Sequence, residues 1–196
     1  LDIGPSFITS NFNFNVEGWI KIIGGGRLNI AQFLKSSKRH FSEKYFNNRI
    51  LKEKIKPVQR QLYLSDLPAK KYIFAEGFNS LFPFLNDSIR PAKGESIVFE
   101  CKDIPQHFLL KHKYFIAPLG NHIFWLGSNY EQSLDLRPSQ LNYEKMCAYL
   151  SKHLNHSFSI IKHETGIRPT VKDRKPLIGR HPEIENVYFL NGLGSK

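Results

Sequence analysis

Cysteine is scarce in this 196-residue chain, which contains only Cys101 and Cys147. Two cysteines in different predicted elements provide neither a disulfide framework nor a cysteine-based metal site. The eight histidines are scattered and lack the ligand spacing of a zinc site, so no metal ligand is predicted. This cysteine usage fits a reducing compartment, and we expect a cytoplasmic protein.

Long apolar runs are also absent. No stretch has membrane-spanning length, and the first residues lack the charged-then-apolar order of a leader. We therefore expect no membrane span. The chain begins with Leu1 instead of Met and stops directly after a Gly-x-Gly, so we expect both ends of the protein to be missing.

A nucleotide-binding glycine motif is missing too. Gly24-Gly25-Gly26 lies between a predicted strand and a predicted helix, but Asn29 stands where the third glycine of the dinucleotide fingerprint is required. No Gly-Lys-Ser/Thr follows. The triple glycine is therefore not a phosphate-binding loop.

Aromatic and basic residues are abundant. Sixteen Phe, eight Tyr and a 41% hydrophobic content are enough for a substantial core and argue against disorder. The formal charge is +11, with much of the excess in 35–56 and 162–180. This charge fits either a solvated basic face or a surface for phosphates, acidic substrates or nucleic acid.

Hydrophobic periodicity predicts a mixed α/β (α+β) chain in which sheet dominates. Asn29 is expected to cap a helix whose apolar positions extend from Ile30 to Tyr45 and pack on a sheet, and a second amphipathic helix is expected over 140–154. A hairpin is predicted around 119–122 and a turn over 91–95. The expected strands are 16–23, 50–55, 61–64, 71–75, 96–100, 113–118, 123–127 and 187–190.

The final thirty-one residues, 166–196, carry the most specific pattern. Arg168 is followed by Pro169, Asp173 begins a tight turn toward Pro176, and the apolar run 187–190 leads into a small-residue loop. Such a loop lets the backbone approach a ligand closely. The layout suits a flat or phosphorylated cofactor.

This order resembles the C-terminal signature of FAD-dependent amino-acid oxidases and dehydrogenases, the family that includes glycine oxidase, D-amino acid oxidase and sarcosine oxidase. Weaker similarities occur at 75–77, 91–95, 114–118 and 126–129. The matching positions of the signature are Gly166, Arg168, Pro169, Asp173, Pro176, Ile178, Gly179, Gly192 and Gly194.

The resemblance implies a truncated two-domain flavoprotein. Residues 1–90 are then part of the FAD domain with linking elements, 91–165 form a substrate-binding domain with an antiparallel-rich sheet, and 166–196 return into the FAD domain. No Gly-x-Gly-x-x-Gly is present, so the N-terminal dinucleotide-binding segment that grips the ADP half of FAD is absent from this chain. By itself the chain is expected to be inactive.

Two side chains are candidates for substrate binding. Arg168 offers a planar donor fork for a carboxylate, and Pro169 stiffens the backbone that aims it. In the glycine-oxidase-like branch, the resemblance implies that this arginine holds the substrate carboxylate. Tyr114 can donate one hydrogen bond to the same group. The alternatives are a structural arginine at a sheet edge and a cross-strand aromatic residue.

The resemblance places Gly77, Gly192, Leu193, Gly194 and Ser195 against the flavin of FAD. Ordinary turns are the alternative for each glycine. Asp173 is interpreted as a turn former that hydrogen-bonds its own backbone. No side chain is assigned a catalytic role, because in this family the flavin carries the chemistry.

The expected function is oxidation of the C–N bond of an amino acid or secondary amine by hydride transfer to FAD. One branch with this signature modifies aminomethyl-uridine in tRNA, so tRNA is a possible partner and the +11 charge would then contact phosphates. A non-catalytic basic relative of the same fold is the other alternative. Oligomeric state, the particular amine and the electron acceptor leave no mark in the sequence.

Overall fold

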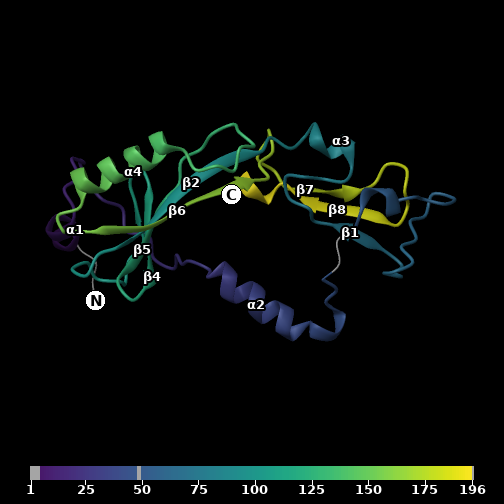
Figure 1. Ribbon diagram of the computed structural model, residues 1–196, viewed down its shortest axis with the longest axis horizontal. Coiled ribbons are helices and arrows are strands. Elements are labelled where there is room, and N and C mark those ends of the chain that lie inside the picture. The colour runs from purple at the N-terminus through teal and green to yellow at the C-terminus, as the bar shows by residue number, and fades with distance from the viewer. Residues whose placement is uncertain (1–4, 48–49, 196) are drawn as a thin grey trace.

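Two sheets lie end to end in a computed structural model that describes residues 5–47 and 50–195 (Figure 1). One sheet has five strands in the order β3-β4-β5-β2-β6, and the other has three in the order β1-β8-β7. The predicted mixed α/β class is confirmed. The strands are β1 (Tyr72–Phe74), β2 (Ala92–Glu100), β3 (Leu110–Lys111), β4 (Phe115–Gly120), β5 (Ile123–Gly127), β6 (Ser159–Arg168), β7 (Leu177–Arg180) and β8 (Val187–Asn191).

Helices are few and short apart from two. The α-helices are α1 (Pro5–Asn11), α2 (Ile30–His40), α3 (Pro83–Asn86) and α4 (Gln140–His153), and single 3-10 turns are η1 (Ser42–Lys44), η2 (Lys52–Lys54) and η3 (Leu193–Ser195). α4 covers one face of the five-stranded sheet, as the view in Figure 1 shows. None of the helices within the described ranges is both long and apolar enough to cross a membrane.

The five-stranded sheet is antiparallel throughout and carries the larger core. Because side chains alternate along a strand, Ile97 and Phe99 of β2 face α4, where Met146 and Leu150 pack against them in the same core cluster. The predicted hairpin is confirmed between β4 and β5. Asn121 and His122 form its two-residue turn with φ of 52° and 61°, which matches the right-handed twist of the strands.

The three-stranded sheet pairs β1 with β8 in parallel and β8 with β7 antiparallel. Phe74, Phe82 and Phe189 meet at its centre with ring centroids 4.8 to 6.3 Å apart. Because β1 and β8 run parallel, their carboxyl ends lie at the same end of the sheet, here called the glycine edge. This arrangement commonly carries ligand sites in α/β proteins.

Several expected elements differ in the structure. Residues 16–23 form no strand and 50–55 contain only η2, while 61–64 contribute a single bridge between Val58 and Gln61. Ile20 and Ile23 are 92% and 88% exposed, so β propensity there finds no neighbouring strand to pair with. The expected turn 91–95 is instead the first half of β2. β6 and β7 were not predicted.

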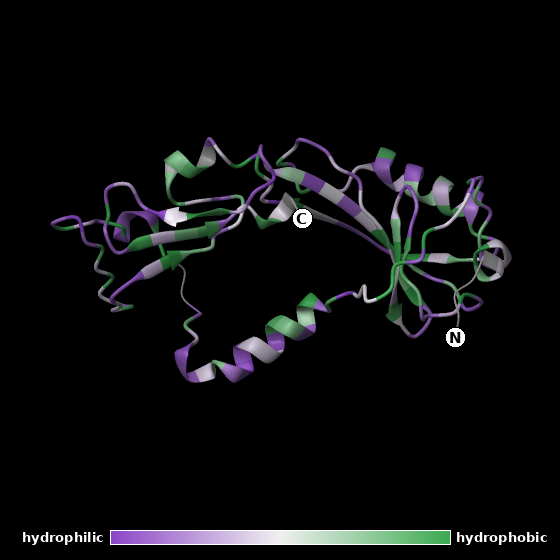
Figure 2. Ribbon diagram, turned by 180° about the vertical axis from the view of Figure 1, so that it is seen from behind, coloured by the Kyte–Doolittle hydropathy of each residue, from purple (hydrophilic) through white to green (hydrophobic). Residues whose placement is uncertain are grey.

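α2 confirms its predicted start and contradicts its predicted packing. The Asn29 side chain accepts a hydrogen bond from the Gln32 N–H, as expected of an N-cap, but the helix buries no residue. Phe33 and Leu34 are about half exposed (52% and 50%). Figure 2 shows green stretches along this helix, which stands apart from both sheets. The expectation that α2 packs on a sheet is wrong for the described part of the chain.

The strands divide between the two sheets near the predicted limits, but Ile8 and Phe12, from the segment 1–90 assigned to the FAD domain, belong to the core of the five-stranded sheet. Strands between 92 and 168 make the five-stranded sheet, while 72–74 and 177–191 supply the strands of the other. The domain boundaries at 90/91 and 165/166 stay a prediction.

Candidate substrate and cofactor site

Arg168 ends β6 and its side chain lies across β2. Its backbone pairs with Ala92, and a Cβ placed on Gly94 would lie 2.2 Å from the Arg168 Nη2. The guanidinium therefore occupies the space that any other residue at position 94 would fill. Gly166, the partner of Gly94 in register, would meet nothing within 4 Å.

The guanidinium is held by the segment that follows β5. Nη2 donates to the Ser128 hydroxyl, and both terminal nitrogens donate to the Asn129 carbonyl oxygen at 3.4 Å. The 3.4 Å contacts are at the long limit for hydrogen bonds. The 128–129 segment thus orients the guanidinium, and a carboxylate that approached Arg168 would gain a charge-assisted bond.

The small-residue loop abuts this arginine. Gly194 donates its N–H to the Pro169 carbonyl at 3.2 Å, and a Cβ on Gly194 would lie 2.8 Å from the Pro169 backbone nitrogen and 2.9 Å from the Arg168 Cβ. Only glycine permits this approach without displacing the backbone. The structure therefore brings Arg168 and the 192–194 loop together.

Gly77 joins the same edge of the three-stranded sheet. It follows β1 with φ of 76°, and Gly192 follows β8 with φ of 74°. Asn191 connects the two loops, because its Nδ2 donates to the Gly77 carbonyl at 2.8 Å and its Oδ1 accepts from the Gly192 N–H at 2.8 Å. Asn191 is buried, and the sequence reasoning assigned it no role. Its position after the apolar run 187–190 was the available signal.

Tyr114 does not join Arg168. It lies in the core with 6% exposure, its ring centroid 5.0 Å from that of Tyr149 on α4, and burial raises the pKa of its phenol. Arg168, Gly94 and Ser96 lie on the opposite face of the sheet, because β2 alternates between them and Ile97. The structure corrects the expected convergence of Tyr114 with Arg168.

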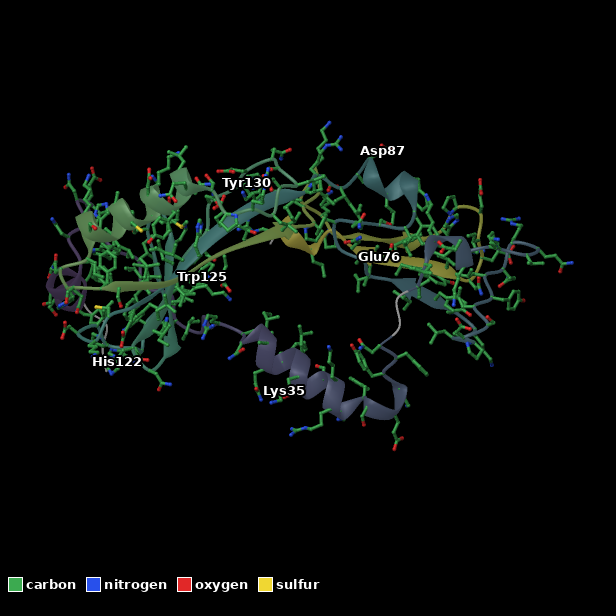
Figure 3. All side chains as sticks on the ribbon, viewed as in Figure 1. Lys35, Glu76, Asp87, His122, Trp125 and Tyr130 are labelled. Atoms are coloured by element: carbon green, nitrogen blue, oxygen red, sulfur yellow. The ribbon has the colours of Figure 1, made fainter. Side chains whose placement is uncertain are left out.

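Phe115 and Trp125 lie on the face that Tyr114 was expected to share. Phe115 pairs with Gly127, which in turn pairs with Ser96. The Trp125 indole lies over Gly127, where an added Cβ would be 2.7 Å from its Cζ2 (Figure 3). Sequence reasoning missed both aromatics. Strand alternation from Ile97 was the signal that could have found them.

Asp173 behaves as predicted for a turn former. Its Oδ1 accepts from the Lys175 N–H at 3.0 Å, two residues along, and no part of its described geometry reaches Arg168. Ser195 belongs to η3 together with the exposed Leu193.

A separate cavity of about 380 Å³ opens on the three-stranded side. Its wall includes Lys52, Arg60, Phe82, His181 and Ile184, and none of the predicted site residues lines it. His181 Nδ1 accepts the N–H groups of Glu183 and Ile184 at 3.0 Å each, and burial lowers its pKa. The imidazole thus serves as an internal cap in its neutral form.

Within residues 5–47 and 50–195, no group of three His, Cys, Asp or Glu side chains can hold a metal ion. Cys101 and Cys147 are both free thiols, and burial raises the pKa of the Cys101 thiol.

A comparison with protein families agrees with this fold and with the glycines that lie beside Arg168. The model of the FAD-dependent oxidoreductase family matches residues 13–196, and the chain belongs to that family. The resemblance predicted from the C-terminal signature is therefore confirmed. FAD is the cofactor of this family, as predicted.

One relative in sequence and two solved structures show how similar the chain is to individual proteins. The chain is 30% identical over 114 residues to glycine oxidase of Bacillus subtilis (strain 168), a match that covers 55% of this chain and 30% of that protein. Iminodiacetate oxidase from Chelativorans sp. BNC1 superposes with a TM-score of 0.58 at 19% identity, over 70% of this chain and 42% of that one. Glycine oxidase from Bacillus cereus ATCC 14579 gives 0.58 at 17%, with the same coverage.

These coverages show that the chain spans less than half the length of the relatives it matches. The two structural likenesses support the mixed α/β fold. Gly77 fits a flavin in one physical respect, since it follows one of two parallel strands at their carboxyl ends and a Cβ placed there would meet nothing within 4 Å.

Proposed function

We propose that this chain supplies the substrate-binding sheet and part of the cofactor edge of an FAD-dependent oxidoreductase that oxidises the C–N bond of an amino acid or secondary amine. The main support is the direct contact between the Arg168–Pro169 pair and the Gly192–Gly194 loop. A cation suited to an acid group and a small-residue loop are thereby adjacent.

In this proposal Arg168 binds the substrate carboxylate. Its guanidinium is half-buried and set over Gly94, so its position is restricted before the substrate arrives. Trp125 and Phe115, on the same face, provide an apolar wall for the rest of the substrate. The interaction fixes which carbon of the substrate faces the cofactor.

The flavin contacts are assigned to Gly77, Gly192, Leu193, Gly194 and Ser195. When bound, the flavin accepts the hydride from the carbon beside the amine. The protein groups named here bind and orient, and none is required to move a proton. This division agrees with the lack of an assigned catalytic side chain.

The test is a visible spectrum of the protein expressed from its complete reading frame. We expect a flavin absorbance that bleaches anaerobically when one member of a panel of amino acids and secondary amines is added. A coloured protein that no member bleaches contradicts amine oxidation. A colourless protein favours the non-catalytic alternative.

Charge supports a second candidate, a flavin enzyme that modifies tRNA. The chain carries +11, and α2 ends with Lys38, Arg39 and His40 without an acidic residue in its first turn. Contacts to phosphates would make binding fall steeply with salt. Retention on an RNA column at moderate salt, lost at high salt, together with no bleaching by free amines, would favour tRNA as the substrate.

The proposed location is the cytoplasm. Two free thiols, one buried beneath the five-stranded sheet core, agree with a reducing compartment. Fractionation of cells that express the complete reading frame tests this location.

A further inference from the structure

We propose that Asn129 is a positioning residue for Arg168, held in place by a buried polar network on the α4 side of the five-stranded sheet. The inference rests on the proposed function of Arg168 as the carboxylate anchor. It adds a residue that touches neither substrate nor cofactor.

Glu95 is the centre of this network. The carboxylate is fully buried, and its Oε1 lies 2.8 Å from the Lys93 Nζ and accepts from the Asn142 Nδ2 at 2.8 Å. Its Oε2 accepts the Ser139 N–H at 2.9 Å and lies 2.9 Å from the His163 Nε2. The His163 approach lacks hydrogen-bond geometry, so its effect on Glu95 depends on charge alone.

Asn129 connects the network to the arginine. Its Oδ1 accepts the Glu95 N–H at 2.6 Å, and its Nδ2 donates to the Glu131 Oε1 at 3.0 Å. Asn142 donates to the same Glu131 oxygen at 2.7 Å, so one amide bridges both carboxylates. The Asn129 side chain is thereby fixed at both of its polar ends.

The backbone of the same residue faces the guanidinium. The Asn129 carbonyl accepts from both terminal nitrogens of Arg168, and the preceding Ser128 hydroxyl accepts from Nη2. The segment is anchored to β2 by paired backbone bonds between Lys93 and Glu131, at 2.8 and 3.0 Å. Fixing Asn129 therefore fixes its own carbonyl oxygen, which accepts from both terminal nitrogens of Arg168.

Stability alone gives a poor account of these buried charges. Replacing a buried ion pair with apolar residues is often neutral or stabilising. On the same strand and face, Ile97 and Phe99 show that an apolar choice fits this sheet. Although burial would raise the pKa of Glu95, hydrogen bonds from Lys93, the Ser139 backbone and Asn142 outweigh it and hold the pKa below its usual value. The carboxylate is thus kept charged at neutral pH.

The experiment compares two Asn→Ala variants in the flavin-loaded protein from the complete reading frame. Asn129→Ala removes both fixing bonds. Asn186→Ala removes a buried asparagine that bonds the Leu62 N–H and carbonyl, at 2.8 and 2.9 Å, in the other sheet's core. Steady-state kinetics use the amino acid that bleaches the flavin, and acetate serves as the carboxylate probe.

We expect Asn129→Ala to raise both the KM and the acetate inhibition constant about tenfold, because a hydrogen-bonded position of the guanidinium is lost. The kcat should change less than about twofold, since the loss concerns binding alone. Asn186→Ala should lower the Tm and leave both constants unchanged. In an Arg168→Ala background, Asn129→Ala should add nothing to either constant.

Three results would overturn the positioning role: an unchanged acetate constant, an equal effect from Asn186→Ala, or an additive effect with Arg168→Ala. Glu131→Gln serves as a milder variant if Asn129→Ala does not fold, and a rise of about threefold in both constants is then expected. Failure of the proposed function itself has a different signature. In that case Arg168→Ala leaves the acetate constant unchanged, or no amine bleaches the flavin.

Discussion

The proposed ligand contacts of the two sheets are of different kinds. On the five-stranded sheet this contact is a side chain, Arg168, held by the Ser128 hydroxyl and the Asn129 carbonyl. On the three-stranded sheet it is backbone, at Gly77, where a Cβ would meet nothing within 4 Å, and in the 192–194 loop. An anchor made of a side chain can be altered without moving the backbone, whereas a glycine loop cannot. Substitutions should therefore separate substrate binding from cofactor binding.

The largest expected effect is on the five-stranded side. Arg168→Ala should raise the KM for a carboxylate substrate about 100-fold, because a charge-assisted bidentate contact is lost. Bound flavin, measured by absorbance per protein, should be unchanged. Arg168→Lys keeps the charge without the fork and should give an intermediate KM. Loss of flavin from Arg168→Ala would contradict the separation of the two sheets.

A somewhat smaller effect is expected on the three-stranded side. Gly194→Ala places a Cβ 2.8 Å from the Pro169 backbone nitrogen, which cannot yield cheaply, so the loop must move. We expect flavin affinity to fall about tenfold, as for the loss of one or two backbone contacts. Gly179→Ala on β7, where a Cβ meets nothing within 4 Å, is the matched control. Flavin titration by fluorescence quenching measures both variants.

A pair of glycine substitutions tests whether the position of the Arg168 side chain matters for substrate binding. Gly94→Ala puts a Cβ 2.2 Å from the Arg168 Nη2, the far end of a flexible side chain, which can swing away at little cost in stability. The KM for a carboxylate should rise about fivefold while the Tm stays nearly constant. Gly166→Ala, directly opposite in the sheet, should leave the KM unchanged. Equal KM values for the two variants would contradict the claim that a Cβ at position 94 displaces the Arg168 guanidinium.

Acid should weaken the contacts around His181 and around Glu95 over different ranges, with the smallest effect of the series. On the five-stranded side, burial also lowers the pKa of His112 beside Tyr149, so the β3 end of that sheet should weaken over the same range as His181. The His181 pKa is lowered by burial, so its stabilisation is complete above its unfolded value of 6.5 and is lost as pH falls through the lower folded value. The Glu95 pKa is lowered as well, and its contribution is lost only as pH falls below 4.5. Each loss should be on the order of 1 kcal/mol.

Hydrogen exchange measured by mass spectrometry from pH 7 to pH 3 can follow both sheets. Amides of β7 and β8 should lose protection first, and those of β2 and β6 later. A single transition for all strands would contradict this order.

Local patterns were sufficient for part of the fold. Hydrophobic spacing predicted α4, and Asn121-His122 was correctly placed in a hairpin turn. β2 was only half predicted, because Lys93, Gly94 and Glu95 have the composition of a turn. Their burial depends on partners such as Asn142, which lies 47 residues from Glu95. β6 was also missed, because the polar residues His163 and Glu164 interrupt its alternation of apolar and polar side chains.

The site was predictable to the extent that its geometry is local. Arg168 and the 192–194 loop were identified from one contiguous signature, and the structure brings them into contact. Tyr114 was assigned to the wrong face because neighbouring strand residues point in opposite directions, and Phe115 takes the exposed position. The amphipathic spacing of α2 predicted an apolar face correctly, but periodicity does not identify what covers such a face.

The bond from the Gly194 amide to the Pro169 carbonyl has a thermodynamic consequence. Any change that an acid at Arg168 makes in flavin affinity through this bond must equal the change that the flavin makes in the affinity for the acid, because such coupling is reciprocal.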